Sequence, residues 1–351
     1  MNYPFSIMDP VSLTRRLIDI ESITGNEAPV GQLLLRELAG LGFDVEKIPV
    51  PFPPEVESHG RERFDVYAKL RDVRPDIVFS THMDTVPPFI PSSEDEARIY
   101  GRGSCDAKGI IAAQIAAALR LRERGVRVGL LYVAGEERDS LGADTANQFS
   151  PHPRFLVNGE PTDNCLATAS KGSLRVQLTA TGRMAHSAYP ELGESAIDKL
   201  LAALQRLLAM SLPLNPEVGP STLNIGVIEG GRAPNVIPDF ARAQLQYRLV
   251  GPSTALRRDI EDAVLGLAHP EFLLEIPFVK LRTIAGLPTM VAAFTTDIPR
   301  LSNWGEPLLF GPGSIHVAHT DAEYIEKGQL LEAIDMYCTI ATKLLCEEGS
   351  R

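Results

Sequence analysis

The sequence predicts an α/β domain with a mainly parallel mixed sheet and helices on both faces, interrupted by an inserted ferredoxin-like α+β domain. Three observations support this fold class. Helical and strand patterns alternate in the first half, a βαββαβ order follows, and strand and helix patterns then resume. The boundaries place residues 1–170 and 283–351 in the first domain and residues 171–282 in the inserted domain.

The first half alternates two kinds of hydrophobic spacing. Apolar residues recur at helical spacing over 10–20 and 27–41, and an Ala-rich helix that can pack closely on a sheet is predicted over 108–125. Strands are predicted at 43–48, 63–70, 76–82, 126–135 and 154–159. The last two are short apolar runs, as expected for parallel strands buried on both faces.

The inserted segment has a different order of elements. Strand, helix, strand, strand, helix and strand patterns occur in turn at 173–182, 195–210, 221–231, 241–250, 254–268 and 272–279. This βαββαβ order is typical of a ferredoxin-like sandwich. Apolar runs at 289–297 and 307–313 and a helix at 328–346 then indicate a return to the first domain.

Composition and charge narrow the class of protein. Of the 351 residues, 44% are hydrophobic and 23% charged, which is the profile of a soluble globular protein. A net charge of −11 without a polybasic run argues against nucleic acid as a partner. No apolar stretch reaches the length of a membrane span, and no signal-peptide pattern is present, so we expect a cytoplasmic protein without a membrane partner. Four scattered cysteines fit reduced thiols in that compartment.

Acidic and histidine side chains follow several predicted strands. His82 and Asp84 come at the end of one strand, and Glu136 and Glu137 follow a second. Glu160 follows a third. Because the carboxyl ends of parallel strands meet at one edge of a sheet, where ligands bind, we expect these side chains to lie close together. His319 follows a fourth strand, and Asp106 lies in a glycine-rich turn that opens the Ala-rich helix.

So many carboxylates in one place require an explanation. Two of them about 4 Å apart repel by roughly 4 kcal/mol at an effective dielectric constant near 20, so protonation, dispersal or bound cations must relieve them. Histidines in the group favour zinc, cobalt or a similar ion over calcium and magnesium. Taken singly, Asp106 is more readily a helix N-cap, Glu136-Glu137 a solvated loop and His82 a structural residue. Their ordered occurrence at strand ends favours a metal site.

The sequence resembles the di-zinc M20 metallopeptidases and deacylases. The resemblance rests on five ordered stretches, "STHMDTVPP", "GRGSCDAKG", "AGEERDSLGAD", "VNGEPTD" and "GPGSIHVAHTDAEY". Two stretches of the inserted domain, "GRMAHSAYPELGESAI" and "GRAPNVIPD", also match the family pattern. The resemblance implies two divalent metal ions, zinc or cobalt, in the first domain.

The resemblance also implies a role for each matching residue. Asp106 would bridge the two ions, His82 and Glu160 would bind one of them, and Glu137 and His319 the other. Asp84 would accept the second ring N–H of His82, and Glu136 would act as general base on a metal-activated water.

His316 is a rival to His319, three residues before it. The family pattern, which places the ligand before an acidic and aromatic stretch, favours His319.

In the inserted domain, the resemblance points to three further residues. His186 would polarise the scissile carbonyl, and Asn235 and Arg248 would hold the substrate carboxylate. The same domain would join two copies of the chain in a homodimer, with His186 often supplied by the partner subunit.

Glu160, rather than Asp, at its position resembles the deacylase and carboxypeptidase branch of the family, and the run over 294–324 is similar to acetylornithine deacetylase. The resemblance implies hydrolysis of an N-acyl amino acid as the leading functional prediction. A desuccinylase or a zinc carboxypeptidase or dipeptidase of the same family, with short peptides as substrates, is the alternative. A non-catalytic metal-binding protein is the alternative of another class, although none of the expected ligands or the base is missing. A di-metal phosphoesterase is disfavoured, since few basic residues accompany the expected site.

Overall fold

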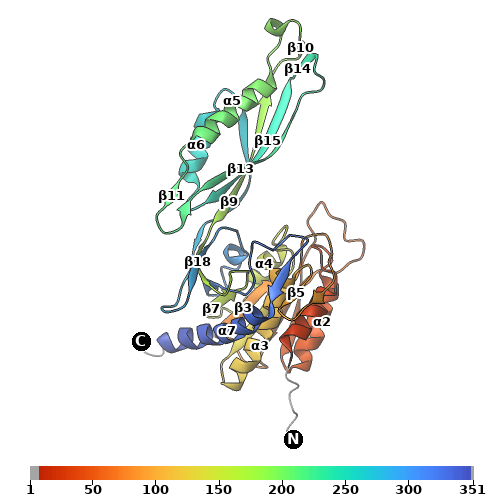
Figure 1. The fold of residues 1–351 in the computed structure, drawn as a ribbon, viewed down its shortest axis with the longest axis vertical. Helices are drawn as coiled ribbons and strands as arrows, with labels where there is room; N and C mark the ends of the chain where they lie inside the picture. The colour runs from red at the N-terminus through yellow and green to blue at the C-terminus, as the bar shows by residue number, and fades with distance from the viewer. Residues whose placement is uncertain (1–7, 349–351) are drawn as a thin grey trace. The chain divides into compact units, whose positions relative to one another are not determined.

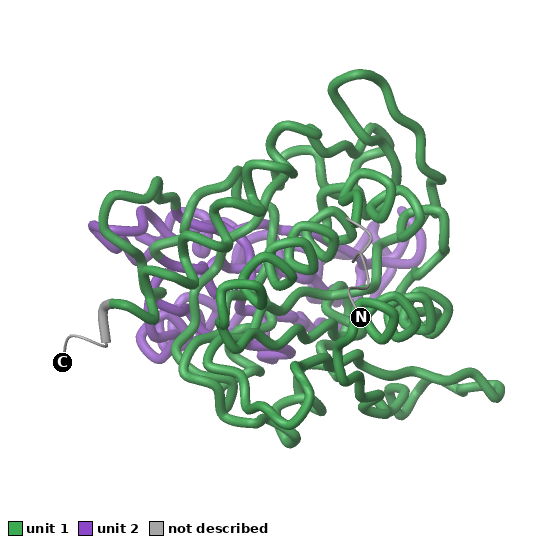
Figure 2. Tube along the Cα trace, turned by 90° about the horizontal axis from the view of Figure 1, so that it is seen from below, with its two compact units in different colours: residues 1–168, 281–290, 296–351 green, residues 169–280, 291–295 purple. Residues whose placement is uncertain are grey.

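The computed structural model describes residues 8–348, and the chain divides into two compact units. The first unit holds residues 1–168, 281–290 and 296–351 (Figure 2). The second unit holds residues 169–280 and 291–295. The second unit differs from the predicted insertion chiefly in residues 291–295, which were expected to belong to the first domain.

The first unit is built on a six-stranded sheet (Figure 1). In spatial order its strands are β1 (Asp44–Pro49), β2 (Phe64–Lys69), β6 (Val128–Val133), β3 (Ile77–His82), β7 (Phe155–Asn158) and β19 (Glu306–Leu309). The last four run parallel to one another, and β2 runs antiparallel to both of its neighbours, β1 and β6. The carboxyl ends of β6, β3, β7 and β19 therefore lie along one edge of the sheet.

Helices cover both faces of this sheet. On one face lie α1 (Pro10–Ile18), α2 (Ala28–Gly40), α3 (Gly109–Glu123) and α7 (Lys327–Glu348), and on the other α4 (Leu141–Ala146). Alternate residues of one strand serve the two faces, as the pleat of a strand requires. Phe79 contacts Tyr337 of α7 at a ring-centroid distance of 4.9 Å, while Tyr67 of β2 faces the other way and packs edge-on against Trp304 at 5.5 Å.

The second unit has the predicted ferredoxin-like order. Along the chain come β9 (Gly172–Thr181), α5 (Ala196–Ala209), β13 (Thr222–Gly230), β15 (Phe240–Leu249), α6 (Thr254–Val264) and β16 (His269–Ile276). The strands form an antiparallel sheet in the order β13-β15-β9-β16, and α5 and α6 pack on it through one apolar core. The predicted fold class is confirmed for both units.

The remaining strands are short, and apart from β18, which lies in the apolar run at 289–297, they were not predicted. They are β4 (Ser93–Glu94), β5 (Arg98–Tyr100), β8 (Leu166–Ser170), β10 (Ala185–His186), β11 (Leu214–Asn215), β12 (Gly219–Pro220), β14 (Val236–Ile237), β17 (Val279–Lys280), β18 (Thr289–Ala292) and β20 (Tyr324–Glu326). Most are too short to show a period in the sequence. Within residues 8–348, no helix has both the length and the apolar character needed to cross a membrane.

Candidate metal centre

The loops after the parallel strands carry the side chains that the sequence singled out. His82 is the last residue of β3, and Glu136 and Glu137 lie shortly after β6. Glu160 lies shortly after β7. Since β6, β3 and β7 are parallel neighbours, all four side chains leave the sheet at the same edge.

Asp106 reaches this edge from a tight turn, Ser104–Lys108, immediately before α3. Its carboxylate lies between two imidazoles: Oδ1 is 2.9 Å from His82 Nε2, and Oδ2 is 3.3 Å from His319 Nε2. His319 Nε2 is also 3.1 Å from Oε1 of Glu137. Ligand atoms of His82, Asp106 and Glu137 lie within 4.8 Å of one another. Asp106 thus contacts one histidine through each of its two carboxylate oxygens.

The donor set suits a borderline divalent ion such as zinc or cobalt. It combines imidazole nitrogens with carboxylate oxygens, a mixture that hard ions such as magnesium do not favour. His82, Asp106 and Glu160 are buried, so their charges have little access to water. Oε1 of Glu160 has no hydrogen-bond partner among the described residues, although it is fully buried. A bound cation would satisfy this oxygen.

Crowding shifts the protonation of these groups in the protein without an ion. Burial raises the pKa of Glu160 well above its usual value, and the neighbouring carboxylates of Asp106 and Glu137 add to the effect, while His82 opposes it. Burial likewise raises the pKa of Glu136, followed by the charges of Glu160 and Asp297. Hydrogen bonds to Asp106 and Glu137 raise the pKa of His319 to about 10. Burial disfavours the charged form of each glutamate and the neighbouring carboxylates add to the effect, so a bound cation would favour their ionised forms.

The fully buried carboxylate of Asp84 holds the loop that carries the two glutamates. Its Oδ1 accepts hydrogen bonds from the backbone N–H groups of Gly135 and Glu136 at 2.9 and 3.1 Å. Its Oδ2 accepts from the Glu137 N–H at 3.3 Å and from the Thr24 hydroxyl at 2.7 Å. Asp84 therefore fixes the backbone position of both glutamates.

The contact between His82 and Asp84 differs from the expected one. His82 Nδ1 lies 3.0 Å from the main-chain oxygen of Asp84 and 3.7 Å from its carboxylate. A carbonyl oxygen can only accept, so Nδ1 carries the proton and Nε2 faces Asp106. The ring orientation is the predicted one, but the backbone of Asp84 provides it because the carboxylate is engaged by the glutamate loop.

Of the two candidate histidines, His316 and His319, the structure brings His319 into the cluster. His319 has a left-handed backbone conformation, with φ of 64°, and its ring points at Asp106 and Glu137. His316 is exposed.

Comparisons with known proteins agree with this arrangement. Residues 168–267 match the model described as the M20 peptidase dimerisation domain. A Schizosaccharomyces pombe protein named as containing a peptidase M20 domain is 40% identical over 337 residues, covering 93% of this chain and 82% of its own. The chain belongs to the M20 peptidase family. A "probable carboxypeptidase" of Aspergillus terreus is also 40% identical, over 366 residues, covering 93% of this chain and 84% of its own.

Solved structures show the same fold. The aminopeptidase PepT of Bacillus cereus has a TM-score of 0.77 at 20% identity, covering 97% of this chain and all of its own. An M20 family metallo-carboxypeptidase of Sulfolobus solfataricus has a TM-score of 0.72 at 16% identity, covering 96% of this chain and 99% of its own. The chain is therefore an M20 hydrolase that acts on amide bonds. The relatives named above give no support to the narrower likeness to acetylornithine deacetylase.

Sequence reasoning did not identify a buried arginine beside the M20 metal cluster. Arg63 donates to Glu27 at 3.0 Å and forms a two-pronged pair with Asp139 at 3.0 and 3.1 Å. Asp139 follows Glu137 in the same loop, so this pair anchors the loop's far end. Arg63 and Glu27 are far away in sequence from the metal motifs, and only Asp139 lies within one.

The three predicted residues of the inserted domain do not form one group within the second unit. His186 in β10 pairs with Val236 in β14, and the Ser187 N–H donates to the Asn235 carbonyl at 3.0 Å, so His186 and Asn235 are neighbours. Arg248 lies near the far end of β15, opposite Ser173 of β9. None of the three has a tested role, and all remain predictions.

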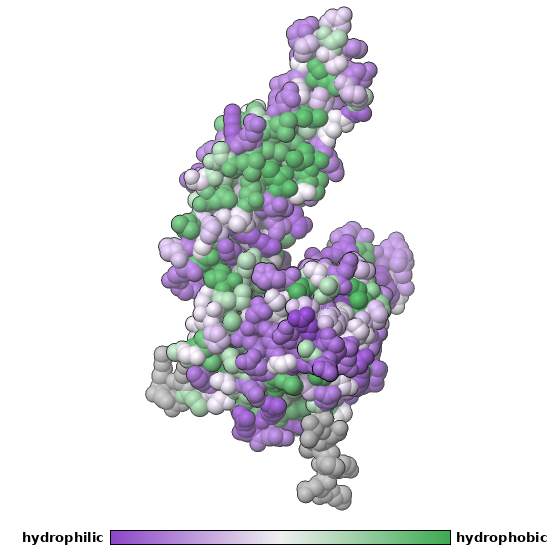
Figure 3. Space-filling model, viewed as in Figure 1, coloured by the Kyte–Doolittle hydropathy of each residue, from purple (hydrophilic) through white to green (hydrophobic). Residues whose placement is uncertain are grey.

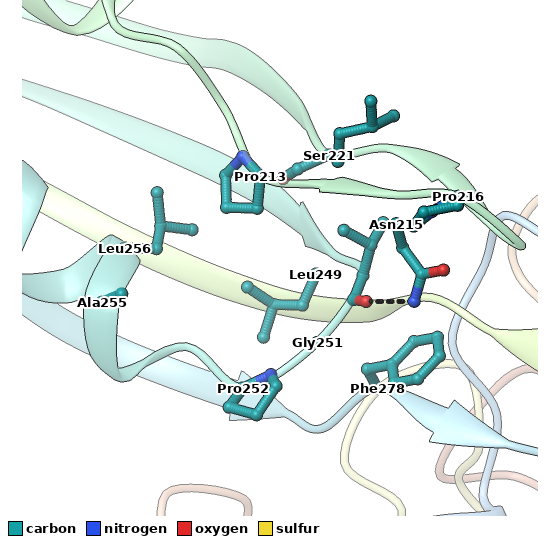
Figure 4. A pocket seen from close by; sticks show the side chains of 12 residues that line it. Pro213, Asn215, Pro216, Ser221, Leu249, Gly251, Pro252, Ala255, Leu256 and Phe278 are labelled. Atoms are coloured by element: carbon teal, nitrogen blue, oxygen red, sulfur yellow. Dashed lines mark hydrogen bonds between the residues drawn. The ribbon is translucent and has the colours of Figure 1, made fainter.

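The second unit also contains an apolar pocket of about 470 Å³ (Figure 4). Three prolines, Leu249, Leu256 and Phe278 contribute to its wall, and Asn215 donates to the Val250 carbonyl at its rim at 3.0 Å. None of the predicted site residues lines it, and it has no ionisable side chain suited to catalysis.

A further buried acid, Asp297, lies near the glutamates. It is 1% exposed, and neither carboxylate oxygen has a well-formed hydrogen bond with a described residue, although the Ser140 hydroxyl lies beside it. Burial raises the pKa of Asp297 to about 7. Its sequence context, "FTTDIPRL", resembles an ordinary polar turn, so nothing in the sequence indicates this environment.

Asp297→Asn should alter how stability depends on pH. Because the folded-state pKa of Asp297 is raised, the wild type loses stability as pH rises from about 4 to about 7, and the variant lacks this loss. We expect the metal-free variant to lose about 2 kcal/mol less unfolding free energy than wild type between pH 5 and pH 8. Urea denaturation at both pH values measures the free energy of unfolding of wild type and variant.

Asp144→Asn is the matched control, since Asp144 is 38% exposed and paired with Arg300. It should follow the wild-type pH dependence closely. Equal losses for wild type and Asp297→Asn would show that Asp297 is not held as a neutral acid.

Proposed function

We propose that this M20 hydrolase is a metallo-carboxypeptidase that removes the C-terminal residue from short peptides. The observation that carries the proposal is a shared carboxylate, Asp106, between two histidines. On the second unit, Arg248 has no carboxylate partner among the described residues, and its guanidinium would suit the free carboxylate of a substrate. The names of the curated relatives favour a peptide as the acyl part of the substrate. An N-acetyl amino acid presents the same amide and the same carboxylate, so the deacetylase remains the second candidate.

The ligand assignment follows the two sides of Asp106. His82 and Glu160 would hold one divalent ion, and Glu137 and His319 the other, with Asp106 between them. The ions, zinc or cobalt, would polarise the scissile carbonyl and lower the pKa of a water molecule at the site. Deprotonated ligands are required for binding, so the protein must release protons as the ions enter.

Glu136 would act as the general base. Its backbone N–H is held by Asp84, while its side chain is free of the histidine contacts that Glu137 makes. Burial raises its pKa, and the charges of Glu160 and Asp297 raise it further, which suits a group that takes a proton and later passes it to the leaving amine.

Arg248 would bind the C-terminal carboxylate of the substrate. Burial is the sole cause that lowers its pKa, and no carboxylate among residues 8–348 forms an ion pair with it. A half-buried guanidinium without a counterion is costly to keep, and a planar carboxylate is the partner that its fork fits best. His186 and Asn235 would contact the scissile carbonyl and the substrate carboxylate.

The second unit would join two copies of the chain. Leu201 and Leu208 of α5 are 48% and 63% exposed and lie seven residues apart, so they share one face of the helix. Figure 3 shows hydrophobic residues gathered on this part of the second unit. β13 forms an edge of the sheet and exposes Val227 and Ile228. An edge strand with exposed apolar side chains is prone to pair with another chain, and a second copy of this protein would cover it.

Glu136→Gln tests the enzyme and its substrate class together. The assay measures free amine released from N-blocked dipeptides, N-acetyl and N-succinyl amino acids and C-terminally amidated peptides. We expect wild type to cleave the blocked dipeptides and the variant to lose about 100- to 10,000-fold in turnover with unchanged metal content, because a general base contributes about that factor. Cleavage of acetylated amino acids alone would assign the deacetylase instead.

Arg248→Met should weaken the use of substrates with a free carboxylate. Loss of one charge-assisted contact costs about 1.5–3 kcal/mol, so kcat/KM should fall about 10- to 150-fold. Arg242→Met, on the same strand but with its guanidinium paired with Glu229, is the control. If both variants keep wild-type kcat/KM, the substrate carboxylate is bound elsewhere.

Leu208→Asp should convert a dimer into a monomer. A charge on the shared face of α5 opposes burial in an interface but costs little in a monomer, where the side chain is already exposed. Light scattering after gel filtration measures the mass, with Leu265→Asp, also exposed, as control. A wild type of monomeric mass at assay concentration would contradict the dimer.

A further inference from the structure

The first unit contains a buried ion pair that touches three of the metal-binding segments. Arg102 is 2% exposed and Glu323 is 1% exposed, and Arg102 Nη1 lies 2.6 Å from Glu323 Oε2. Such burial is expensive unless every remaining donor and acceptor is used. The two side chains use theirs on the backbone of the metal-binding loops.

Glu323 contacts the turn that presents Asp106. Its Oε1 accepts hydrogen bonds from the backbone N–H of Cys105 at 3.2 Å and from that of Asp106 itself at 3.3 Å. One carboxylate oxygen thus binds the turn, and the other binds Arg102. Among the side chains of the described residues, Glu323 is the one that holds the Asp106 N–H.

Arg102 extends the contact to two more segments. Its Nη1 donates to the Thr320 carbonyl at 3.2 Å, the residue after His319. Its Nε donates to the Pro88 carbonyl at 3.4 Å, in the segment that follows Asp84. A guanidinium can reach all three partners at once because its donors form a rigid fork.

The backbone around Arg102 is shaped for this position. Gly101 and Gly103 flank it with φ of 131° and 87°, conformations that other residues rarely adopt. A Cβ on Gly103 would lie 2.9 Å from Thr85, and one on Gly101 2.7 Å from Ile18. The glycines let the chain pass close to its neighbours while Arg102 points inward.

We propose that Glu323 and Arg102 are positioning residues that fix Asp106 relative to His319 and so set the affinity of the second metal ion. The inference rests on the proposed metal roles of Asp106 and His319. Groups that orient metal ligands typically change metal affinity or activity about 10- to 100-fold when they are removed. Asp84 supports His82 through its main-chain oxygen and Glu137 through its carboxylate, whereas Arg102 holds the carbonyl of Thr320 beside His319. The His319 position therefore depends most on this pair.

Glu323→Gln is the test, because it keeps the size of the side chain. Its single amide oxygen can accept from the Asp106 turn or from Arg102, but not from both, since the amide nitrogen is a donor. Calorimetric titration with cobalt should give two ions for wild type. In the variant, one ion should bind with wild-type affinity and the second about 10- to 100-fold more weakly. The visible spectrum of the second cobalt should change, and kcat should fall more than KM changes.

Glu326→Gln is the matched control, from β20, the short strand that begins at the residue after Glu323. Glu326 pairs with Arg98 at 3.3 Å on the surface, so its loss should leave both cobalt affinities and the spectrum unchanged. If Glu323→Gln does not fold, Arg102→Lys keeps the charge but cannot reach Pro88, Thr320 and Glu323 together, and it should show the same selective loss.

The outcomes separate the inference from the proposed function. Wild-type affinity and spectrum for both ions in a folded Glu323→Gln or Arg102→Lys variant would overturn the positioning role alone. Equal weakening of both ions would also overturn it, since it would indicate a general loosening. Failure of wild type to bind two ions would overturn the metal roles themselves.

Discussion

The buried carboxylate of Asp84 is the interaction on which the rest of the metal centre depends. It accepts four hydrogen bonds, from Thr24 and from the N–H groups of three consecutive residues beginning at Gly135. Burial alone would raise the pKa of Asp84, but nearby His82 and these donors hold it below its usual value. A charged acceptor of this kind is worth more per hydrogen bond than a neutral one. No neutral side chain of similar size could accept from both sides.

The surroundings of Asp84 explain why two adjacent glutamates can have different tasks. The backbone N–H groups of both are held by one carboxylate, and their side chains have different neighbours. Glu137 reaches His319 and Asp106, whereas Glu136 is surrounded by the charges of Glu160 and Asp297. Glu137 is thus held against a histidine, whereas Glu136 has no histidine contact, and burial raises the pKa of both carboxyls. The two roles proposed for these glutamates correspond to this difference in contacts.

The sequence predicted the elements that have a clear period and the residues that stand at their ends. Both units, the parallel strands and the ferredoxin-like order followed from hydrophobic spacing. His82 and Glu137 came together because parallel strands end at one edge, and Asp106 joins them from the turn before α3. Strands of two or three residues, such as β10 and β20, have no period and were missed. Arg63, Arg102 and Asp297 were missed because an isolated charged residue has no pattern that indicates burial. Their partners lie up to 221 positions away in sequence.

The two buried arginines pair with some acids of the site and not with others. Arg63 and Arg102 each neutralise carboxylates at the margin of the cluster, Glu27 and Asp139 in one case and Glu323 in the other. Neither arginine pairs with Glu136, Glu137 or Glu160. The protein therefore pairs the acids that shape the loops with arginine, while Asp106 and Glu137 contact histidines. Burial raises the pKa of Glu136 and Glu160 and so favours their neutral forms, and a bound divalent cation would favour the ionised forms and release protons.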